Sequence, residues 1–572
     1  MSKSGCAPYG SSRFFLPAVS PLGQLPESSE ELLVVAGESP QKYFGDFCLL
    51  YIMGGELFTG GSWTRHSHPT INLIEVVNMA EGIRHNCGFC VAHTLHDAYS
   101  FIRSLQHRGR EAAGIAAVGD GRIDVIKWAG GVDRFDVTDL HKIFPSPSYH
   151  TYMAHVRYAT RGRKDQILAD AHPHVVGGQV EARGNHILIS NCELAAVHNG
   201  QVDRLFYENI SPDQVQSSCD TEALLYIYRQ RGEYDFLRQI PGAFSMAIAD
   251  VRKRDVISLR DRSGIKPAVL GWKDGKYGVA SEDIAFRKNG GEYIEDLEPG
   301  TIYYLTPEGD YTKQKLLDPM PAYCFFEWNY ITDVDSRING VSVRRIREAL
   351  GEALAEEFHP DDVDLVTYLP RCPEVAARAY AKKAGLQFDT VFYKMRGERS
   401  FLGTTAAERR KSIGENLHLL PGKSDELEGK TVILLDDSIV RGNNSKRARQ
   451  LLYEGCKVKK AYLVSYTPPI GIVGQDGIPR GCTFGVDMPP DPPPGDEFIA
   501  RGRTQDEISR AMEMPVVYIS LRSMFKAFER AGIPEANLCT YCIGGKYPFA
   551  DYATGLPVGA SAQLDLLQVE GS

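Results

Sequence analysis

The segment 431–444, TVILLDDSIVRGNN, constrains the fold of this chain more than any other stretch. Its first part, 431–435, is apolar and rich in branched side chains, which predicts a buried parallel strand. Asp436 and Asp437 end this strand, and a turn over 438–444 leads into a helical pattern that closes on Gly455. A strand, a loop and a helix in this order are typical of an α/β domain.

The same segment carries groups that suit a phosphorylated sugar. The two carboxylates can accept hydrogen bonds from vicinal hydroxyls or hold Mg²⁺ through water, and the loop N–H groups and helix N-terminus can hold a phosphate. The alternative is a buried strand that ends in a solvated acidic turn. The segment resembles the phosphoribosyl pyrophosphate (PRPP) motif of type I phosphoribosyltransferases. This resemblance implies that PRPP and Mg²⁺ bind Asp436, Asp437, Ser438, Arg441, Gly442, Asn443 and Asn444.

Bulk properties exclude several classes of protein. With 572 residues, the chain is long enough for two or three domains with full cores. Its net charge of −9 argues against a general nucleic-acid surface, and no apolar run approaches the ~18 residues of a membrane helix. We therefore expect a cytoplasmic protein that binds neither nucleic acid nor membrane. Twelve cysteines in such a chain favour thiols and metal ligands over disulfides.

A second chemical centre is predicted around Cys87. The stretch 87–115 places apolar residues at helical spacing behind this cysteine, turns at Gly109 and runs toward a strand. The segments AHVRYATRG, AVHNGQV and CDTEALLYI follow at 154–162, 196–202 and 219–227, and PGAFSMAIAD, RDRSGIKPAVLG and VASED follow at 241–250, 260–271 and 279–283. Their order and spacing resemble the class II glutamine amidotransferase domain, an N-terminal-nucleophile hydrolase.

That resemblance implies a role for each residue of the centre. Cys87 would be the nucleophile and the first residue of the mature chain, with its own α-amino group as general base. Asn199 and Gly200 match the oxyanion-hole positions. Arg157 matches the partner of the glutamine α-carboxylate, Asp220 matches the acceptor of its α-ammonium, and Arg108 belongs to the wall of the pocket.

An N-terminal Cys87 requires removal of the residues before it. Met79 lies 87 − 79 = 8 positions upstream, which resembles the short propeptide of the family. Two explanations fit residues 1–78, which have no counterpart in the family. Either translation begins at Met79, or the segment is an extension that is removed with the propeptide.

Four cysteines stand in positions that indicate a metal or cluster site: Cys324, Cys482, Cys539 and Cys542. The C-x-x-C pair at 539–542 alone is compatible with zinc, a redox pair, a cluster or free thiols. All four positions resemble those of the [4Fe–4S] ligands in one branch of the amidophosphoribosyltransferases, and four thiolates are a sufficient set. We expect a structural cluster. Cys6, Cys48, Cys192, Cys219 and Cys456 have no such context and are expected to be inert.

Two segments depart from the family pattern. The expected pyrophosphate loop contains Arg371, Cys372, Pro373 and Glu374 in place of an acidic residue followed by small residues, and Pro373 lacks an N–H donor. Arg371 would either hold the diphosphate or mark a changed substrate. The flexible loop over 393–402 keeps its outline, and Lys394, Arg396 and Arg399 would cover the diphosphate when the loop closes.

These observations together predict an α/β protein with two catalytic domains. An αββα glutaminase domain is expected over 87–318 and a type I phosphoribosyltransferase domain over 319–550. An N-terminal extension with propeptide (1–86) and a tail (551–572) flank them. The predicted reaction transfers ammonia from glutamine to PRPP. Alternatives are a diverged homologue with another phosphorylated acceptor and a non-enzymatic PRPP or nucleotide sensor. The resemblance also implies a homo-oligomer and feedback by purine nucleotides.

Overall fold

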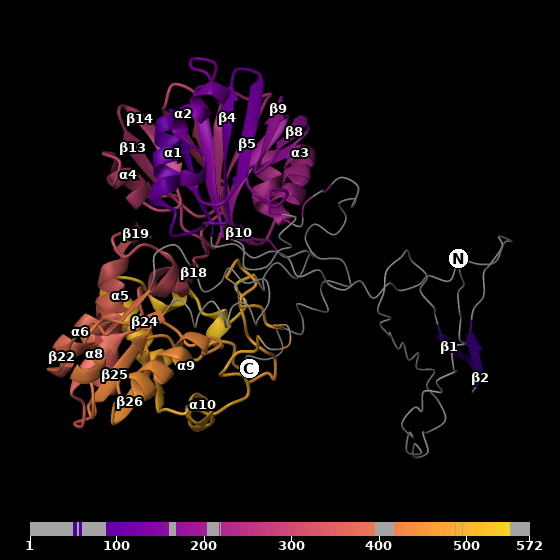
Figure 1. Cartoon of the computed structure of the whole chain (residues 1–572). Coiled ribbons are helices and arrows are strands. Elements are labelled where there is room, and N and C mark those ends of the chain that lie inside the picture. The colour runs from indigo at the N-terminus through magenta and orange to yellow at the C-terminus, as the bar shows by residue number, and fades with distance from the viewer. Residues whose placement is uncertain are drawn as a thin grey trace, which may run out of the picture. The chain divides into compact units, whose positions relative to one another are not determined.

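The computed structural model describes residues 50–53, 56–59, 87–158, 167–202, 215, 217, 219–394, 417–486, 488–492, 494 and 496–549 (Figure 1). The chain divides into two compact units, Met1–Met79 and Ala80–Ser572. In the first unit, β1 (Leu50–Met53) pairs antiparallel with β2 (Glu56–Thr59). Every other described element belongs to the second unit.

The first half of this second unit contains two antiparallel sheets. The nine-stranded sheet has the order β15-β13-β14-β3-β6-β4-β5-β9-β8, and the six-stranded sheet has the order β17-β16-β12-β11-β10-β7. The strands of the larger sheet are β3 (Gly88–Ala92), β4 (Ala112–Gly119), β5 (Arg122–Ala129), β6 (Thr151–Arg157), β8 (Gln179–Arg183), β9 (His186–Ser190), β13 (Val269–Lys273), β14 (Lys276–Ala280) and β15 (Glu292–Asp296). Those of the smaller sheet are β7 (His174–Val176), β10 (Leu194–Gln201), β11 (Ala243–Asp250), β12 (Val256–Arg260), β16 (Thr301–Leu305) and β17 (Tyr311–Lys315).

Helices cover the outer faces of both sheets. They are α1 (Leu95–Ser104), the short η1 (Val132–Arg134), α2 (Val137–Ile143), α3 (Asp220–Gln239) and α4 (Ile284–Arg287). Because side chains alternate along a strand, Phe89 and Val91 of β3 pack between the sheets while Cys90 and Ala92 pack against α1. A third core lies between α3 and strands β10, β11 and β12. These three cores give the αββα layering, and Figure 1 places α1 and α3 on this part of the unit.

The second half is built on a five-stranded parallel sheet of order β22-β21-β25-β26-β27. Its strands are β21 (Leu365–Tyr368), β22 (Gln387–Phe388), β25 (Thr431–Asp436), β26 (Lys460–Ser465) and β27 (Val516–Tyr518). Three small pairs accompany it: β18 (Tyr323–Cys324) with β28 (Leu538–Cys539), β19 (Arg337–Ile338) with β20 (Val341–Ser342), and β23 (Phe392–Lys394) with β24 (Leu417–Leu419).

The helices of this half are α5 (Val343–Glu357), α6 (Glu374–Ala384), α8 (Lys423–Glu426), α9 (Asn443–Gln450), α10 (Gln505–Met512) and α11 (Leu521–Ala531). Short helical segments are η4 (Glu327–Ile331), η5 (Leu451–Gly455), η6 (Glu535–Asn537) and η7 (Tyr541–Ile543). Ile433 and Leu435 of β25 pack into one core, and Val432 and Leu434 pack into the other. The apolar run at 431–435 is therefore unbroken because both faces of its strand are covered.

The strand predicted at 431–435 is confirmed as β25, but the loop after it is shorter than predicted. The loop ends at Gly442, which has a left-handed φ of 75°, and Asn443 already begins α9. A left-handed cap of this kind turns the chain directly into the helix, so Asn443 and Asn444 are first-turn residues. The helix predicted behind Cys87 is confirmed as α1, with β3 between them. Within the described residues, the helices are too short or too polar to cross a bilayer.

Candidate active sites

Cys87 lies at the start of β3, beside the end of β6, because Gly88 is paired with Val156. The residue is fully buried, and Arg108 Nε donates a hydrogen bond of 2.8 Å to the Cys87 carbonyl oxygen. Burial raises the pKa of the Cys87 thiol to about 12, although the Tyr158 backbone and the cations Arg157, Arg108 and Lys266 oppose this rise. The thiol is thus placed among positive charges but is protonated at neutral pH.

A buried ionic network surrounds Arg108. Its guanidinium contacts Glu282 at 2.6 Å and Glu327 at 3.1 Å, and Lys266 Nζ also contacts Glu327 at 3.1 Å. Burial opposes ionisation of Glu327, but Arg108 and Lys266 outweigh it and hold the pKa of this carboxyl below its usual range. Glu327 belongs to η4 of the second half. The network therefore connects the backbone of Cys87 to the parallel-sheet half of the unit.

Arg157 and Asn199 present buried polar atoms in the same region. Arg157 ends β6, and its Nη2 donates to Asp170 at 3.4 Å, while its Nε has no hydrogen-bond partner among the described residues. Asn199 lies on β10 and is fully buried, and neither atom of its side-chain amide has a partner within the described part of the chain. Since an unsatisfied buried polar group costs free energy, both side chains are suited to a polar ligand.

Backbone geometry fixes the neighbours of these side chains. Gly200 has a φ of 147°, and a Cβ at this position would lie 1.9 Å from the Ala243 carbonyl oxygen, so only glycine fits. The bond between His155 Nε2 and the His198 carbonyl oxygen, 3.0 Å long, joins β6 to β10. It brings the strand that carries Asn199 next to the strand that carries Arg157.

Asp220 is the first residue of α3, and its Oδ2 accepts a hydrogen bond of 2.8 Å from the Val202 N–H. Its Oδ1 lies 3.7 Å from His198 Nδ1. The hydrogen bond places Asp220 beside Val202, which directly follows β10 and lies two residues beyond Gly200. In the sequence, Asp220 directly follows Cys219. The structure thus places all six predicted glutaminase residues in one region, Cys87, Arg108, Arg157, Asn199, Gly200 and Asp220.

Asp436 and Asp437 form the second candidate site, at the carboxyl end of β25. Each side chain is 8% exposed, and burial raises the pKa of both carboxyls, that of Asp437 to about 6. Ser438 Oγ donates to Asp437 at 2.9 Å, and Ser445 Oγ donates to Asp436 at 3.3 Å. Burial lowers the pKa of Lys394, and the two carboxylates oppose this effect, so Lys394 lies near the pair.

The loop between β25 and α9 contacts residues 496 and 512, which lie outside the carboxylate pair. Arg441 Nε lies 3.1 Å from Asp496 Oδ1, so its guanidinium is engaged away from the carboxylate pair. A Cβ on Gly442 would lie 2.9 Å from Met512 Sδ, in addition to its left-handed φ. Asn444 Oδ1 is buried and has no hydrogen-bond partner among the described residues. Arg396 and Arg399 lie outside the described residues.

The divergent segment 371–374 ends in the first residue of α6. Arg371 is exposed, and its charge contributes to the lowered pKa of Lys394, so it faces the same site. Cys372 Sγ donates to the Asn329 carbonyl oxygen at 3.1 Å and lies 3.5 Å from Tyr466 Oη. Asn329 is part of η4, as is Glu327. The same short segment therefore contacts both candidate sites.

The four predicted cluster cysteines surround one small pocket. Its lining includes Cys324, Cys482, Cys539 and Cys542, each 7–8% exposed. Cys324 is aligned with Cys539 in the parallel pair β18–β28, and the Phe484 N–H donates to Cys482 Sγ at 3.4 Å. Among the described residues, the only group of three or more His, Cys, Asp or Glu side chains whose ligand atoms all lie within 4.8 Å of one another lies elsewhere. The four sulfurs are therefore spread wider than around a single ion.

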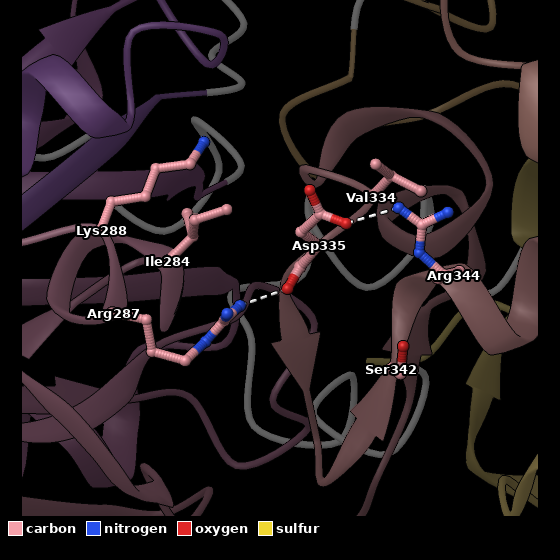
Figure 2. Close-up of a pocket in the computed structure, with 7 residues that line it drawn as sticks. All are labelled: Ile284, Arg287, Lys288, Val334, Asp335, Ser342 and Arg344. Carbon is pink, nitrogen blue, oxygen red and sulfur yellow. Dashed lines mark hydrogen bonds and ion pairs between the residues drawn. The ribbon is translucent and has the colours of Figure 1, made fainter.

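A separate pocket of about 380 Å³ lies near residues 284–288 and 334–344 (Figure 2). Asp335 lies between two arginines of this pocket. Its carbonyl oxygen accepts a hydrogen bond from Arg287, and its carboxylate accepts one of 2.5 Å from Arg344. The pocket contains none of the predicted site residues. Its cations are neutralised locally, so we assign it no role in the chemistry.

Sequence reasoning missed several residues that the structure places at these sites. Lys266, Glu282 and Glu327 form the network around Arg108, and Asp170 is paired with Arg157. Lys266 and Glu282 lie within the segments RDRSGIKPAVLG and VASED, which are part of the glutaminase resemblance and could have identified them. Cys219, which is expected to be inert, has its Sγ in one buried group with His172 and His174.

Comparisons with known proteins bear on both halves. A family model described as a glutamine amidotransferase domain matches residues 180–288. The chain is 30% identical over 472 residues to an amidophosphoribosyltransferase of Methanocaldococcus jannaschii, covering 79% of this chain and 93% of that protein. It is 28% identical to the amidophosphoribosyltransferase of Bacillus subtilis, covering 79% of this chain and 91% of the relative.

A solved structure gives the same result. The glutamine PRPP amidotransferase of B. subtilis, in complex with ADP and GMP, superposes with a TM-score of 0.65 at 26% identity. The match covers 81% of this chain and 97% of that one. The αββα sandwich and the parallel sheet are thus the two halves of one known architecture.

Proposed function

This chain belongs to the amidophosphoribosyltransferase family, and we propose that Cys87 and the Asp436–Asp437 pair are the centres of its two half-reactions. The enzyme transfers ammonia from glutamine to PRPP and gives 5-phosphoribosylamine, glutamate and pyrophosphate, in purine synthesis. The proposed glutaminase domain spans 87–318, and the proposed transferase domain spans 319–550. The observation that carries the site assignment is the fully buried, unsatisfied amide of Asn199 in the region that holds Cys87.

In the glutaminase half-reaction, glutamine would be held at both ends of its amino-acid group. Arg157 Nε, a buried donor, would bind the α-carboxylate, and Asp220 would accept from the α-ammonium. The Cys87 thiolate would attack the side-chain amide carbon. Asn199 Nδ2 and the Gly200 N–H would stabilise the oxyanion that forms. Ammonia would leave, and water would hydrolyse the thioester to glutamate.

Processing of the chain supplies the missing base. Burial raises the pKa of the Cys87 thiol to about 12, so the thiol would not ionise unaided at neutral pH. If residues before Cys87 are removed, its new α-amino group, with an ordinary pKa of roughly 7.7–8.0, can accept the thiol proton. The surrounding cations Arg157, Arg108 and Lys266 would then stabilise the thiolate.

In the transferase half-reaction, Asp436 and Asp437 would bind the ribose hydroxyls of PRPP. Two adjacent, mostly buried carboxylates are oxygen ligands of the kind that Mg²⁺ takes, and such an ion would neutralise charge on the diphosphate. The N–H groups of Ser438 to Gly442 and the start of α9 would hold the 5′-phosphate. Lys394 and Arg371 would lie over the diphosphate, and Arg396 and Arg399 would join them.

The four-cysteine pocket fits a [4Fe–4S] cluster better than zinc. Four thiolates on one tetrahedral zinc ion would lie about 3.8 Å apart, given Zn–S bonds of about 2.3 Å. No three of the four described sulfurs here lie within 4.8 Å of one another, which suits a cluster larger than a single ion. The N–H donor of Phe484 and the nearby Lys266 cation suit a negatively charged cluster. Its proposed role is structural, since it would tie the 538–543 segment to Cys324.

Purine nucleotides are the proposed feedback ligands, supported by the B. subtilis relative, whose solved structure holds ADP and GMP. A homo-oligomer stays an expectation from the family.

Pyrophosphate release tests the function directly. Anaerobically purified enzyme, supplied with Mg²⁺, should release pyrophosphate only when PRPP and either glutamine or ammonia are present. Mass spectrometry of the same preparation should find Cys87 at the N-terminus and about four irons per chain. An active enzyme whose chain begins at Met1 or Met79 would refute the processing step, and stoichiometric zinc without iron would refute the cluster.

A further inference from the structure

Three ligand-bearing side chains meet in the core of the glutaminase domain, outside the residues assigned to its chemistry. His172, His174 and Cys219 each offer one ligand atom, and these three atoms lie within 4.8 Å of one another. The three residues are 1–2% exposed. They come from two segments of the chain that are 45 residues apart, as 219 − 174 = 45. We propose that they form a zinc site, which goes beyond the proposed function because neither half-reaction needs this ion.

The chemistry of the set matches zinc. Zinc is bound by thiolate sulfur and imidazole nitrogen, and sites with three protein ligands keep a fourth position for water. His172 Nε2 lies 4.0 Å from Cys219 Sγ, a separation that a shift of well under 1 Å brings to the distance between neighbouring tetrahedral ligands. A mixed set of two imidazoles and one thiolate is soft enough to exclude Mg²⁺ and Ca²⁺, which take oxygen ligands.

The backbone holds both ligand segments in place. His174 begins β7 and is paired with Ala196 of β10. A Cβ on Gly114 would lie 2.2 Å from the His172 carbonyl oxygen, so the absence of a side chain lets this segment lie directly on β4. Cys219 is the N-cap residue of α3. The ligands therefore sit on the sheet and at a helix start, as a preformed site requires.

The surroundings supply an outer layer of polar groups. Thr221 Oγ1 lies 3.4 Å from Cys219 Sγ and 2.9 Å from His198 Nδ1. It also lies 3.0 Å from His172 Nε2, and zinc would take its place at that nitrogen. The ring of His155 stacks on that of His172 with centroids 4.1 Å apart. The stacked ring would hold the plane of the His172 imidazole, and Thr221 would remain a polar neighbour of the thiolate. A divalent cation would also balance the negative charge of the thiolate beside Asp220, whose Oδ1 is 3.5 Å from Cys219 Sγ.

The zinc site would affect glutamine binding only by holding the glutamine-binding residues in place. Cys219 directly precedes Asp220, and His174 lies on the strand next to β10, which carries Asn199 and Gly200. Zinc would therefore join the start of α3 to the six-stranded sheet. The junction lies where Asp220 meets β10. His172, His174 and Cys219 would be positioning residues, and zinc would stabilise the domain in its binding-competent form.

Zinc stoichiometry tests this proposal without reference to activity. Wild-type enzyme and the variants His174→Phe and Cys219→Ser are stripped with a chelator anaerobically, dialysed against zinc and analysed for metal. Wild-type should retain about one zinc per chain more than either variant. Because the variants leave Cys324, Cys482, Cys539 and Cys542 intact, metal at that pocket is the same in all samples. Cys192→Ser, another buried cysteine of this domain, is the matched control and should bind as wild-type.

A second readout guards against misfolding of one variant. Zinc should raise the thermal unfolding midpoint of wild-type and of Cys192→Ser by roughly 5 °C and should not raise that of His174→Phe. Equal zinc content in wild-type and both variants, or an equal thermal shift in all of them, would overturn the proposal. Neither result bears on whether glutamine and PRPP are substrates, so its failure is distinguishable from failure of the proposed function.

Discussion

In the glutaminase half the proposed reactive group is a thiol near three cations, whereas in the transferase half it is a pair of carboxylates near Arg347 and Lys394. Burial raises the pKa of Cys87 to about 12 despite Arg157, Arg108 and Lys266, and it raises that of Asp437 to about 6 despite Arg347 and Lys394. Both groups therefore need something further: ionising the thiol requires a base, and stabilising two adjacent buried carboxylates in their charged form requires a cation. The thiol needs a base created by processing, and the carboxylates need a cation brought with the substrate.

The two regions also differ in how they are built. The glutaminase residues lie on or beside paired strands, so register fixes them without a ligand. The carboxylates end a strand and are followed by a loop, and part of the proposed diphosphate contact falls on residues 396 and 399. We therefore expect glutamine hydrolysis to fall when a single side-chain group of the first site is removed. At the second site, we expect activity to depend on bound ligand and stability to depend on pH.

Loss of the nucleophile should have the largest effect and should separate the halves. Cys87→Ala should reduce glutamine-dependent pyrophosphate release by roughly 10⁴-fold or more, the scale for removal of a covalent nucleophile. Activity with added ammonia should be kept, because the transferase site is untouched. Steady-state assays with each nitrogen source measure this, and Cys456→Ala, a buried cysteine of the transferase half, is the control. Equal loss with both sources would contradict independent sites.

Loss of the oxyanion donor should come next. Asn199→Ala should lower kcat for glutamine hydrolysis by about 10²- to 10³-fold, because one preorganised donor is removed from the transition state. KM for glutamine should change little, since the amide does not hold the α-amino or α-carboxylate groups. Kinetics of glutamate release give both constants. Asn185→Ala, in the turn before β9, should behave as wild-type. A large rise in KM with unchanged kcat would place Asn199 in binding instead.

Loss of one carboxylate should weaken transfer and strengthen the fold. Asp437→Asn should reduce PRPP-dependent pyrophosphate release on the order of 10²-fold, with glutamine hydrolysis intact. The raised pKa of Asp437 means that its ionisation destabilises the free enzyme above pH 6. Asn at this position should therefore raise the free energy of unfolding at pH 7.5 by on the order of 2 kcal/mol.

The pH dependence of the difference in free energy of unfolding between Asp437→Asn and wild-type tests this explanation. Between the ordinary carboxyl pKa of 3.8 and about 6, the folded wild-type binds the proton that the unfolded chain has lost, so the advantage of the variant should shrink as pH falls through this window. Urea unfolding across the window measures it. Asp362→Asn, a carboxylate paired with Lys460 at the opposite end of the sheet, is the control. An advantage that is constant with pH would mean that Asp437 ionises normally.

The divergent loop should give the smallest effect. Arg371→Ala should raise the Kd for PRPP by about 10-fold, the change expected from ~1.4 kcal/mol of lost electrostatic attraction near Lys394. Calorimetry with Mg²⁺ present measures this constant. Arg378→Ala, on the exposed face of α6 and paired with Glu374, should leave it unchanged. Unaltered PRPP binding in Arg371→Ala would mean that this side chain does not replace the missing loop donors.

Much of this arrangement could be predicted from the sequence because its signals are local. The strand, carboxylate pair and helix at 431–455 follow from apolar run and turn chemistry, and the glutaminase residues fall in recognisable segments. The end of the loop at Gly442 could not be predicted, because the left-handed conformation of this residue depends on tertiary packing. Nor could the group formed by His172, His174 and Cys219, because its members are brought together only by the pairing of β7 with β10 and the start of α3.

The central claim is that one chain hydrolyses glutamine at Cys87 and uses the released ammonia at Asp436 and Asp437. Wild-type enzyme with Mg²⁺, PRPP and amide-¹⁵N-glutamine, in the presence of excess unlabelled ammonium near neutral pH, measures this directly. We expect ¹⁵N in the newly formed phosphoribosylamine and, in a parallel reaction without added ammonium, glutamate and pyrophosphate in equal amounts. Pyrophosphate release without ¹⁵N in the product, or glutamate formation with no pyrophosphate, would contradict the account.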